Sequence, residues 1–220
     1  DVRSVMGALV YLVKTRLPEY IGASPFEIQV LTPMRKGELG VEHLNEVLQY
    51  YLNPASESKK EKEGRTGVFR EGDKVMQVKN NYKLEWKITN AKGFSIEEGL
   101  GVFNGDMGII KQINTYSERI TVVFDENREA EYPFSSLDEL ELAYAITIHK
   151  SQGSEYPAVV LPLLSGPPIL CNRNLLYTAI TRAQKCVAIA GRQSMVEQMI
   201  HNETEQKRYS GLNDCLKEGL

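Results

Sequence analysis

AYAITIHKSQGSE at residues 143–155 and LLYTAITRAQK at residues 175–185 are the two stretches that decide how this sequence folds. The first predicts a strand that runs into a polar, flexible turn, and the second predicts an apolar helix that ends at Arg182. The turn carries four residues suited to contacts with a ligand: His149, Gln152, Gly153 and Glu155. The rest of the chain is interpreted outward from these two stretches.

Composition is that of an ordinary globular domain. The 220 residues are 42% hydrophobic and 25% charged, enough for one core and a small second module. No apolar run reaches the length of a membrane span. The cysteines, Cys171, Cys186 and Cys215, form no C-x-x-C pair, which predicts reduced thiols and a cytoplasmic protein. The histidines show no zinc-type spacing, so no metal site is expected, and the start without Met suggests a piece of a longer protein.

Charge is distributed unevenly along the chain. Residues 58–92 hold ten Lys or Arg against five acids, a net charge of +5. Residues 93–142 hold three against eleven, a net charge of −8. A basic track in the first segment could meet phosphates, although a solvated charged surface explains the same counts.

Hydrophobic periodicity predicts alternating helices and strands. Helices are expected at 2–17, 41–52, 173–184 and 193–207, and buried-type strands at 26–33, 156–164 and 185–191. Residues 53–67 read as a polar loop, and a compact strand follows within 69–82. Short β-type runs divided by Asn-Gly, Asp and Gly turns fill residues 93–142. The expectation is an α/β domain with a parallel sheet, made of segments 1–92 and 143–220, and a small β-barrel inserted at 93–142.

Five stretches, in order, resemble the second motor domain of superfamily 1 DNA helicases of the RecD family, which includes the exodeoxyribonuclease V alpha subunit. They are VLTPMRKGELGVEHLN (30–45), GDKVMQVKNNY (72–82), VFNGDMG (102–108) and the two stretches quoted first. The resemblance implies a RecA-like domain of the P-loop-NTPase type, itself without the P-loop, and an SH3-like barrel. It also implies ATP-driven 5′ to 3′ movement on single-stranded DNA in recombination and repair.

The same resemblance implies cofactors and partners. ATP and Mg²⁺ would be held mainly by an N-terminal motor domain of the same protein. Single-stranded DNA would be the track, and nuclease and helicase subunits of a RecBCD-like complex are candidate partners.

The nucleotide-binding candidates are Gly153, Glu155, Arg182 and Arg35. An ATPase driven by domain closure needs a cation to neutralise charge on the γ-phosphate, and by resemblance Arg182 is this catalytic arginine finger. Gly153 permits a tight turn of backbone N–H groups, and Glu155 could accept from a ribose hydroxyl. Arg35, with Thr32 and Pro33, matches the fourth helicase motif but is offset from the position that distant relatives use. A surface arginine remains the alternative for each guanidinium.

The DNA-binding candidates are Thr147, His149, Lys150, Gln77, Lys79, Asn80 and Asn81. The first three stand where related motors touch the strand. Amide and ammonium groups at 77–81 could hold phosphates without reading sequence, and Tyr82 or Trp86 could stack a base. A structural His149, a Gln152 that only orders the turn and a buried Tyr82 are the alternatives.

One apparent phosphate-binding loop fails on inspection. GVFREGDK at 67–74 places its Lys one position late and lacks the following Ser or Thr. We therefore expect these residues alone to lack ATPase activity. Two other hypotheses stay open: the helicase segment of a conjugative relaxase, and a non-catalytic module that binds single-stranded DNA or protein.

Overall fold

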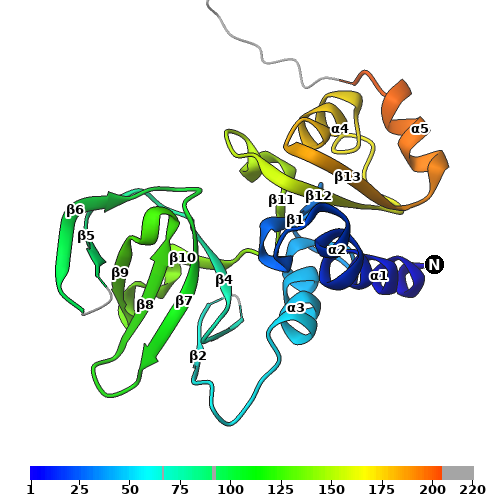
Figure 1. Cartoon of the computed structure of the whole chain (residues 1–220). Helices are drawn as coiled ribbons and strands as arrows, with labels where there is room; N and C mark the ends of the chain where they lie inside the picture. The colour runs from blue at the N-terminus through cyan, green and yellow to red at the C-terminus, as the bar shows by residue number, and fades with distance from the viewer. Residues whose placement is uncertain (66, 91–92, 205–220) are drawn as a thin grey trace, which may run out of the picture.

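The computed structural model describes residues 1–65, 67–90 and 93–204, which form two parts side by side (Figure 1). One part is a parallel sheet between helices, and the other is an antiparallel sheet. The expected mixed α/β fold with a parallel sheet is confirmed. Residues 205–207 of the expected last helix, and Cys215, lie outside the described residues.

The parallel sheet has the strand order β11-β1-β12-β13. Its strands are β1 (Ile28–Thr32), β11 (Ala145–Thr147), β12 (Tyr156–Leu163) and β13 (Ala183–Gly191). β1 is buried along its whole length because helices cover both faces of the sheet. This burial explains why β1 and β12 read as continuous apolar runs rather than as alternating ones.

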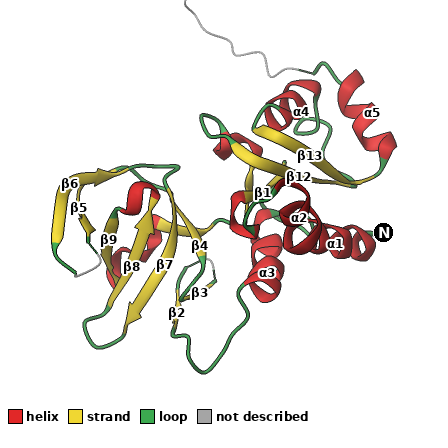
Figure 2. Ribbon diagram, viewed as in Figure 1, coloured by secondary structure: helices red, strands yellow, loops and turns green. Residues whose placement is uncertain are grey.

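Two groups of helices sandwich this sheet (Figure 2). α1 (Val2–Tyr11) and α3 (Val41–Leu52) bury Leu9 and Leu48 in a cluster with Val30 of β1. α4 (Arg173–Ile180) and α5 (Gln193–His201) pack into a second cluster with Leu31. Neighbouring residues of a strand point to opposite faces of the sheet. Val30 therefore packs in the first cluster and Leu31 in the second.

The first helix does not stop at Pro18, contrary to our expectation. A π-helical segment, η1 (Leu12–Arg16), follows α1 and leads directly into α2 (Leu17–Ile21), with Pro18 in the first turn of α2. Pro18 directly follows the π-helical segment, where the N–H of Leu17 bonds to the carbonyl of Leu12, so the regular i to i−4 pattern is already interrupted before the proline. The helix ends instead at Gly22, whose φ of 67° is left-handed.

The antiparallel sheet has seven strands in the order β10-β4-β7-β8-β9-β5-β6. They are β4 (Lys74–Gln77), β5 (Asn81–Thr89), β6 (Ser95–Val102), β7 (Met107–Asn114), β8 (Arg119–Phe124), β9 (Glu129–Pro133) and β10 (Leu140–Leu142). A small hairpin, β2 (Glu61–Glu63) and β3 (Val68–Arg70), precedes them. β4 and β5 lie before residue 93, so strand pairing starts this sheet earlier in the chain than the change in sequence texture indicated. The division into domains at 92 and 142 stays a prediction.

The chain passes from the antiparallel sheet to the parallel sheet through residues 142–145, which are buried. Asn45 donates its amide to the carbonyls of Leu142 (3.0 Å) and Ala145 (2.9 Å) and accepts from the N–H of Ala145 (2.8 Å). Gln29 donates to the two carbonyls between, those of residues 143 and 144, at 3.1 and 3.2 Å. Two side-chain amides therefore satisfy four consecutive carbonyls that water cannot reach.

Two buried charges adjoin this link. Asp73 accepts hydrogen bonds from Asn53 (2.7 Å), Gln49 (2.6 Å) and the Tyr144 hydroxyl (2.9 Å). Burial raises the pKa of Asp73, although these hydrogen bonds oppose the rise. Lys74 donates to Gln29 Oε1 at 2.8 Å, and burial lowers its pKa to about 8. The start of β4 is thus tied to the parallel-sheet side by polar contacts.

No helix in the described part of the chain is long and apolar enough to cross a membrane.

We predict that Asn45→Ala lowers the free energy of unfolding by about 3 kcal/mol, because it leaves buried backbone groups without partners. Urea denaturation followed by circular dichroism measures the change. The matched control is Gln198→Ala, which removes an exposed amide from α5 and should cost less than about 0.5 kcal/mol. Equal effects of the two substitutions would contradict the role of Asn45.

We predict that stability rises with pH between 8 and 10 through Lys74. Below pH 8 the folded and unfolded chains both hold this proton; above it the folded chain has released the proton while the unfolded chain, with a pKa of 10.5, still binds it. The free energy of unfolding should gain about 2 kcal/mol over this range. In Lys74→Met the gain should disappear. Urea titrations at pH 8, 9 and 10 test this, and parallel curves for both proteins would contradict it.

Candidate nucleotide and nucleic-acid sites

The predicted site residues that belong to the parallel sheet gather at opposite ends of its strands. At the carboxyl ends of β1 and β11, Thr32 and Thr147 pair in register, and Arg35 and Lys150 follow them. At the amino ends of β12 and β13, Tyr156 pairs with Ala183. Residues 153–155 and Arg182 directly precede these two strand starts. The structure therefore separates the candidates into an amino-end group and a carboxyl-end group.

Arg182 joins the two stretches that opened the sequence analysis. Its Nη1 donates to the carbonyl of Ser154 at 3.2 Å, and its own carbonyl accepts from the N–H of Tyr156 at 2.8 Å. Nε donates to the carbonyl of Thr178 (3.2 Å) and Nη2 to Thr181 Oγ1 (3.3 Å). The side chain is half-buried at the end of α4. Contacts with both sequence stretches therefore fix the position of Arg182.

The bonding of Arg182 leaves a fork of donors. A guanidinium has five N–H groups, and the three contacts with described residues take one from Nε and one from each terminal nitrogen. One N–H on Nη1 and one on Nη2 remain outside these contacts. Arginine can bind a phosphate through N–H groups on both of its terminal nitrogens.

Gly153 and Glu155 complete the amino-end group. Gly153 has a φ of 89°, a conformation that favours glycine, and a Cβ added there would meet open space. Glu155 is exposed and accepts from Gln184 at 3.4 Å, and Gln152 is exposed beside it. A cationic fork, an open turn and an exposed carboxylate suit the phosphates and ribose of a nucleotide. Among the described residues no group of three or more His, Cys, Asp or Glu side chains could hold a metal ion.

The carboxyl-end group is built on a short 3-10 helix, η5 (Ile148–Ser151). Thr147 begins it by accepting the N–H of Lys150 on Oγ1 at 3.3 Å. His149 is exposed on this turn. Lys150 Nζ donates to Glu141 Oε2 at 3.0 Å, and Arg35 Nη2 donates to Glu141 Oε1 at 2.6 Å. The structure thus links Arg35 to the DNA candidate Lys150.

Sequence analysis missed Glu141. Its side chain is only 12% exposed, on β10, and it contacts two of the predicted cations. The sequence did hold a signal, because Glu141 is a single charge within the otherwise apolar run LELAYAI at 140–146. A charge at a buried strand position normally has a partner.

Gln77 is not a surface donor, which corrects our expectation for it. It has no exposed surface, and its amide donates to the carbonyl of Lys79 (2.8 Å) and to Glu139 (3.0 Å). Its Oε1 accepts from the hydroxyl of Tyr132 at 2.9 Å. These bonds fix the loop that follows β4, so Gln77 shapes the DNA candidates without being able to touch DNA.

The other members of the 77–81 segment lie nearer the surface. Lys79 is exposed and paired with Asp138, and Asn81 donates to Glu139 at 3.0 Å. Asn80 is exposed and accepts on Oδ1 from the N–H of Asn104 at 2.9 Å. These contacts join the loop after β4 to the turn between β6 and β7.

Tyr82, and not Trp86, presents an open aromatic face. Tyr82 is 67% exposed and packs edge-on against Phe103, with ring centroids 5.6 Å apart. Trp86 is half-buried, with the guanidinium of Arg128 over its ring at 5.6 Å. Phe103, 42% exposed, was not predicted, although its motif was noted.

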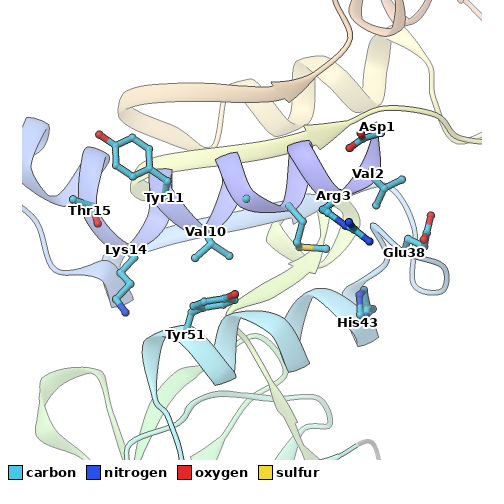
Figure 3. Close-up of a pocket in the computed structure, with 12 residues that line it drawn as sticks. Asp1, Val2, Arg3, Val10, Tyr11, Lys14, Thr15, Glu38, His43 and Tyr51 are labelled. Carbon is cyan, nitrogen blue, oxygen red and sulfur yellow. The ribbon is translucent and has the colours of Figure 1, made fainter.

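A groove of about 850 Å³ between α1 and α3 contains none of the predicted site residues (Figure 3). Tyr11, Lys14, His43 and Tyr51 are among the side chains that line it. The hollow and the two motif groups are therefore different places on the molecule.

Comparison with known families matches two parts of the chain. Residues 44–124 match the ATP-dependent RecD-like DNA helicase SH3 domain, and residues 142–190 match the UvrD-like helicase C-terminal domain. The first match includes β4 and β5, and the second includes Glu155 and Arg182.

Individual relatives agree with these matches. The ATP-dependent RecD2 DNA helicase of Deinococcus radiodurans is 39% identical over 76% of this chain and 20% of its own length. The RecBCD enzyme subunit RecD of Mycolicibacterium smegmatis is 30% identical over 87% of this chain and 29% of its own length. A crystal structure of Pif1 helicase from Bacteroides, in complex with ADP-AlF3 and ssDNA, superposes with a TM-score of 0.50 at 19% identity, covering 96% of this chain and 49% of that one.

The fold is therefore that of a RecA-like helicase motor domain that carries a small SH3-like barrel. The chain belongs to the RecD-like family of superfamily 1 helicases. It spans about a fifth of the length of the D. radiodurans relative and under a third of the mycobacterial one.

Proposed function

We propose that this chain is the second motor domain, with its barrel, of an ATP-dependent DNA helicase that moves 5′ to 3′ on single-stranded DNA in recombination and repair. The observation that supports this most is the contact of Arg182 with Ser154, because it assembles one phosphate-binding group from both helicase motifs. Family membership supports the same reaction.

In this proposal the amino-end group completes a nucleotide site shared with another motor domain. That domain holds the phosphates of ATP and Mg²⁺. Arg182 places its two remaining N–H groups on the γ-phosphate and neutralises the charge that develops there. Glu155 accepts from the ribose, and Gly153 lets the turn approach the nucleotide. The 220 residues alone then have no ATPase activity.

The carboxyl-end group and the barrel grip the DNA. Thr147, His149 and Lys150 contact the strand from η5, while Lys79, Asn80 and Asn81 contact it from the loop after β4. Nucleotide-dependent closure changes this grip and produces steps. Further nuclease and helicase subunits, of the kind named for the RecBCD relative, are candidate partners.

We predict that Arg182→Ala lowers kcat for DNA-stimulated ATP hydrolysis about 10³-fold or more in the protein that contains both motor domains. Hydrolysis in the presence of oligo(dT) measures it, and circular dichroism checks the fold. Arg192→Ala is the matched control, since Arg192 is an exposed arginine before α5 and should keep normal activity. A normal kcat for Arg182→Ala would exclude the arginine finger.

We predict that Tyr82→Ala weakens binding of oligo(dT) by about 1–3 kcal/mol, because one stacking surface is lost. Fluorescence anisotropy measures the affinity. Tyr116→Ala is the control, since Tyr116 is 98% exposed on the turn between β7 and β8 and its loss should change nothing. Equal affinities for the two variants would remove Tyr82 from the DNA surface.

A further inference from the structure

Glu141 is the centre of a cluster of cations drawn from three separate segments. Arg35 follows β1, Lys150 lies in η5 and Arg65 lies in the turn of the β2–β3 hairpin. Their nitrogens lie 2.6, 3.0 and 3.9 Å from the carboxylate oxygens, so the first two are hydrogen-bonded and the third is a loose ion pair. Glu141 itself belongs to β10, the last strand of the barrel.

The carboxylate lies beneath its cations. Glu141 has a side-chain exposure of 12%, against 45% for Arg35 and 30% for Lys150. Burial would raise the pKa of Glu141, but the hydrogen bonds and charges of Arg35 and Lys150 bring it below its usual value, so the group stays ionised. Arg35 is hydrogen-bonded to one oxygen of Glu141 and Lys150 to the other, and both cations remain partly exposed.

The position of Arg35 and Lys150 in the sheet indicates which ligand they bind. Arg35 and Lys150 follow the carboxyl ends of adjacent strands, which pair in register at Thr32 and Thr147. Arg182 precedes the amino end of β13. An arginine that bound the same nucleotide phosphates as Arg182 would be expected in the amino-end group.

We propose that Arg35 and Lys150 act as one pair that binds the phosphodiester backbone of single-stranded DNA, and that Glu141 is the positioning residue that fixes their spacing. This inference rests on the proposed function and moves Arg35 from the nucleotide to the DNA. It also makes the barrel part of the grip, since β10 carries the residue that orders both cations.

The direction in which Glu141→Gln changes DNA affinity separates a positioning role from simple electrostatics. Glu141→Gln removes a negative charge beside the DNA, so electrostatics alone would tighten binding. If Glu141 positions the cations, the same change frees two long side chains and weakens binding, because their ordering must then be completed on association.

The experiment uses the protein with both motor domains and fluorescent oligo(dT) over a range of NaCl concentrations. Arg35→Gln and Lys150→Gln should each weaken binding about tenfold and reduce the slope of log K against log salt by about 0.7, with an unchanged KM for ATP. Glu141→Gln should weaken binding by a similar factor. In the Glu141→Gln background, a second change at Arg35 should cost less than it does alone.

Glu42→Gln is the matched control. Glu42 also accepts from Arg35, on its Nε at 3.4 Å, but it is 43% exposed and does not touch Lys150 through any described contact. Its loss should leave DNA affinity unchanged or slightly higher. Thermal unfolding checks that each variant folds. Should Glu141→Gln fail to fold, the variants Arg35→Gln and Lys150→Gln still test whether the pair binds DNA.

Tighter binding by Glu141→Gln would overturn the positioning role. A raised KM for ATP in Arg35→Gln, with normal DNA affinity, would return Arg35 to the nucleotide site. If the unsubstituted protein bound no oligo(dT), the proposed function would fail as a whole. If it bound DNA and none of the variants differed, only the present inference would fail.

Discussion

The buried link at residues 142–145 is the constraint on which the arrangement of this molecule depends. A chain that leaves an antiparallel sheet and enters a parallel one must cross the interior without a ladder for part of its course. Asn45 and Gln29 donate to its four carbonyls, and the N–H of Val30 also reaches the carbonyl of Tyr144, at 3.4 Å. Since unsatisfied backbone groups in the interior are costly, these two amides set where the barrel sits relative to the motor sheet.

This placement has consequences for both candidate sites. Glu141 directly precedes the link, and Thr147 and Lys150 follow it within one short strand and turn. The edge strand β10 and the carboxyl-end group are therefore held at a fixed spacing by the short, buried stretch between them. On the far side, α4 packs on η5, β12 and β13, so Arg182 and the 147–155 segment belong to one packed unit.

Sequence reasoning succeeded where a pattern is local and failed where a partner is distant. Apolar runs predicted the strands β12 and β13, and the sequence marked Gly153 as a turn residue, which has a left-handed φ. β13 was expected to be buried, but it lies at the edge of the sheet and only its Ala190 is buried. From sequence alone β4 could belong to either sheet, because KVMQ is short and holds only two apolar residues, Val75 and Met76. Its place beside β7 and β10 follows from long-range pairing.

The same limit applies to side chains. Gln77 carries donors suited to phosphates, and its burial and its contact with Glu139, 62 positions away, reveal that these donors are used internally. Arg35 was a candidate nucleotide contact, and its hydrogen bond to Glu141, 106 positions away, links it to Lys150. Amides and cations of this kind are used equally for scaffolding and for binding, so burial and partner decide between the two roles.

Arg35 and Arg182 differ in whether a neighbouring carboxylate compensates their charge, and the functional argument depends on this difference. Arg35 is paired with the carboxylate of Glu141, and its charge is partly cancelled before any ligand arrives. Arg182 is held by carbonyl and hydroxyl oxygens, which orient a guanidinium without neutralising it. In the described part of the chain no carboxylate lies within ion-pair distance of Arg182.

A catalytic cation must keep its full charge for the transition state, because charge already compensated in the resting site contributes less when the phosphoryl group transfers. A cation that only grips DNA can share its charge with a neighbour and still hold a phosphate. The polar surroundings of Arg182 fit the first role, and those of Arg35 fit the second.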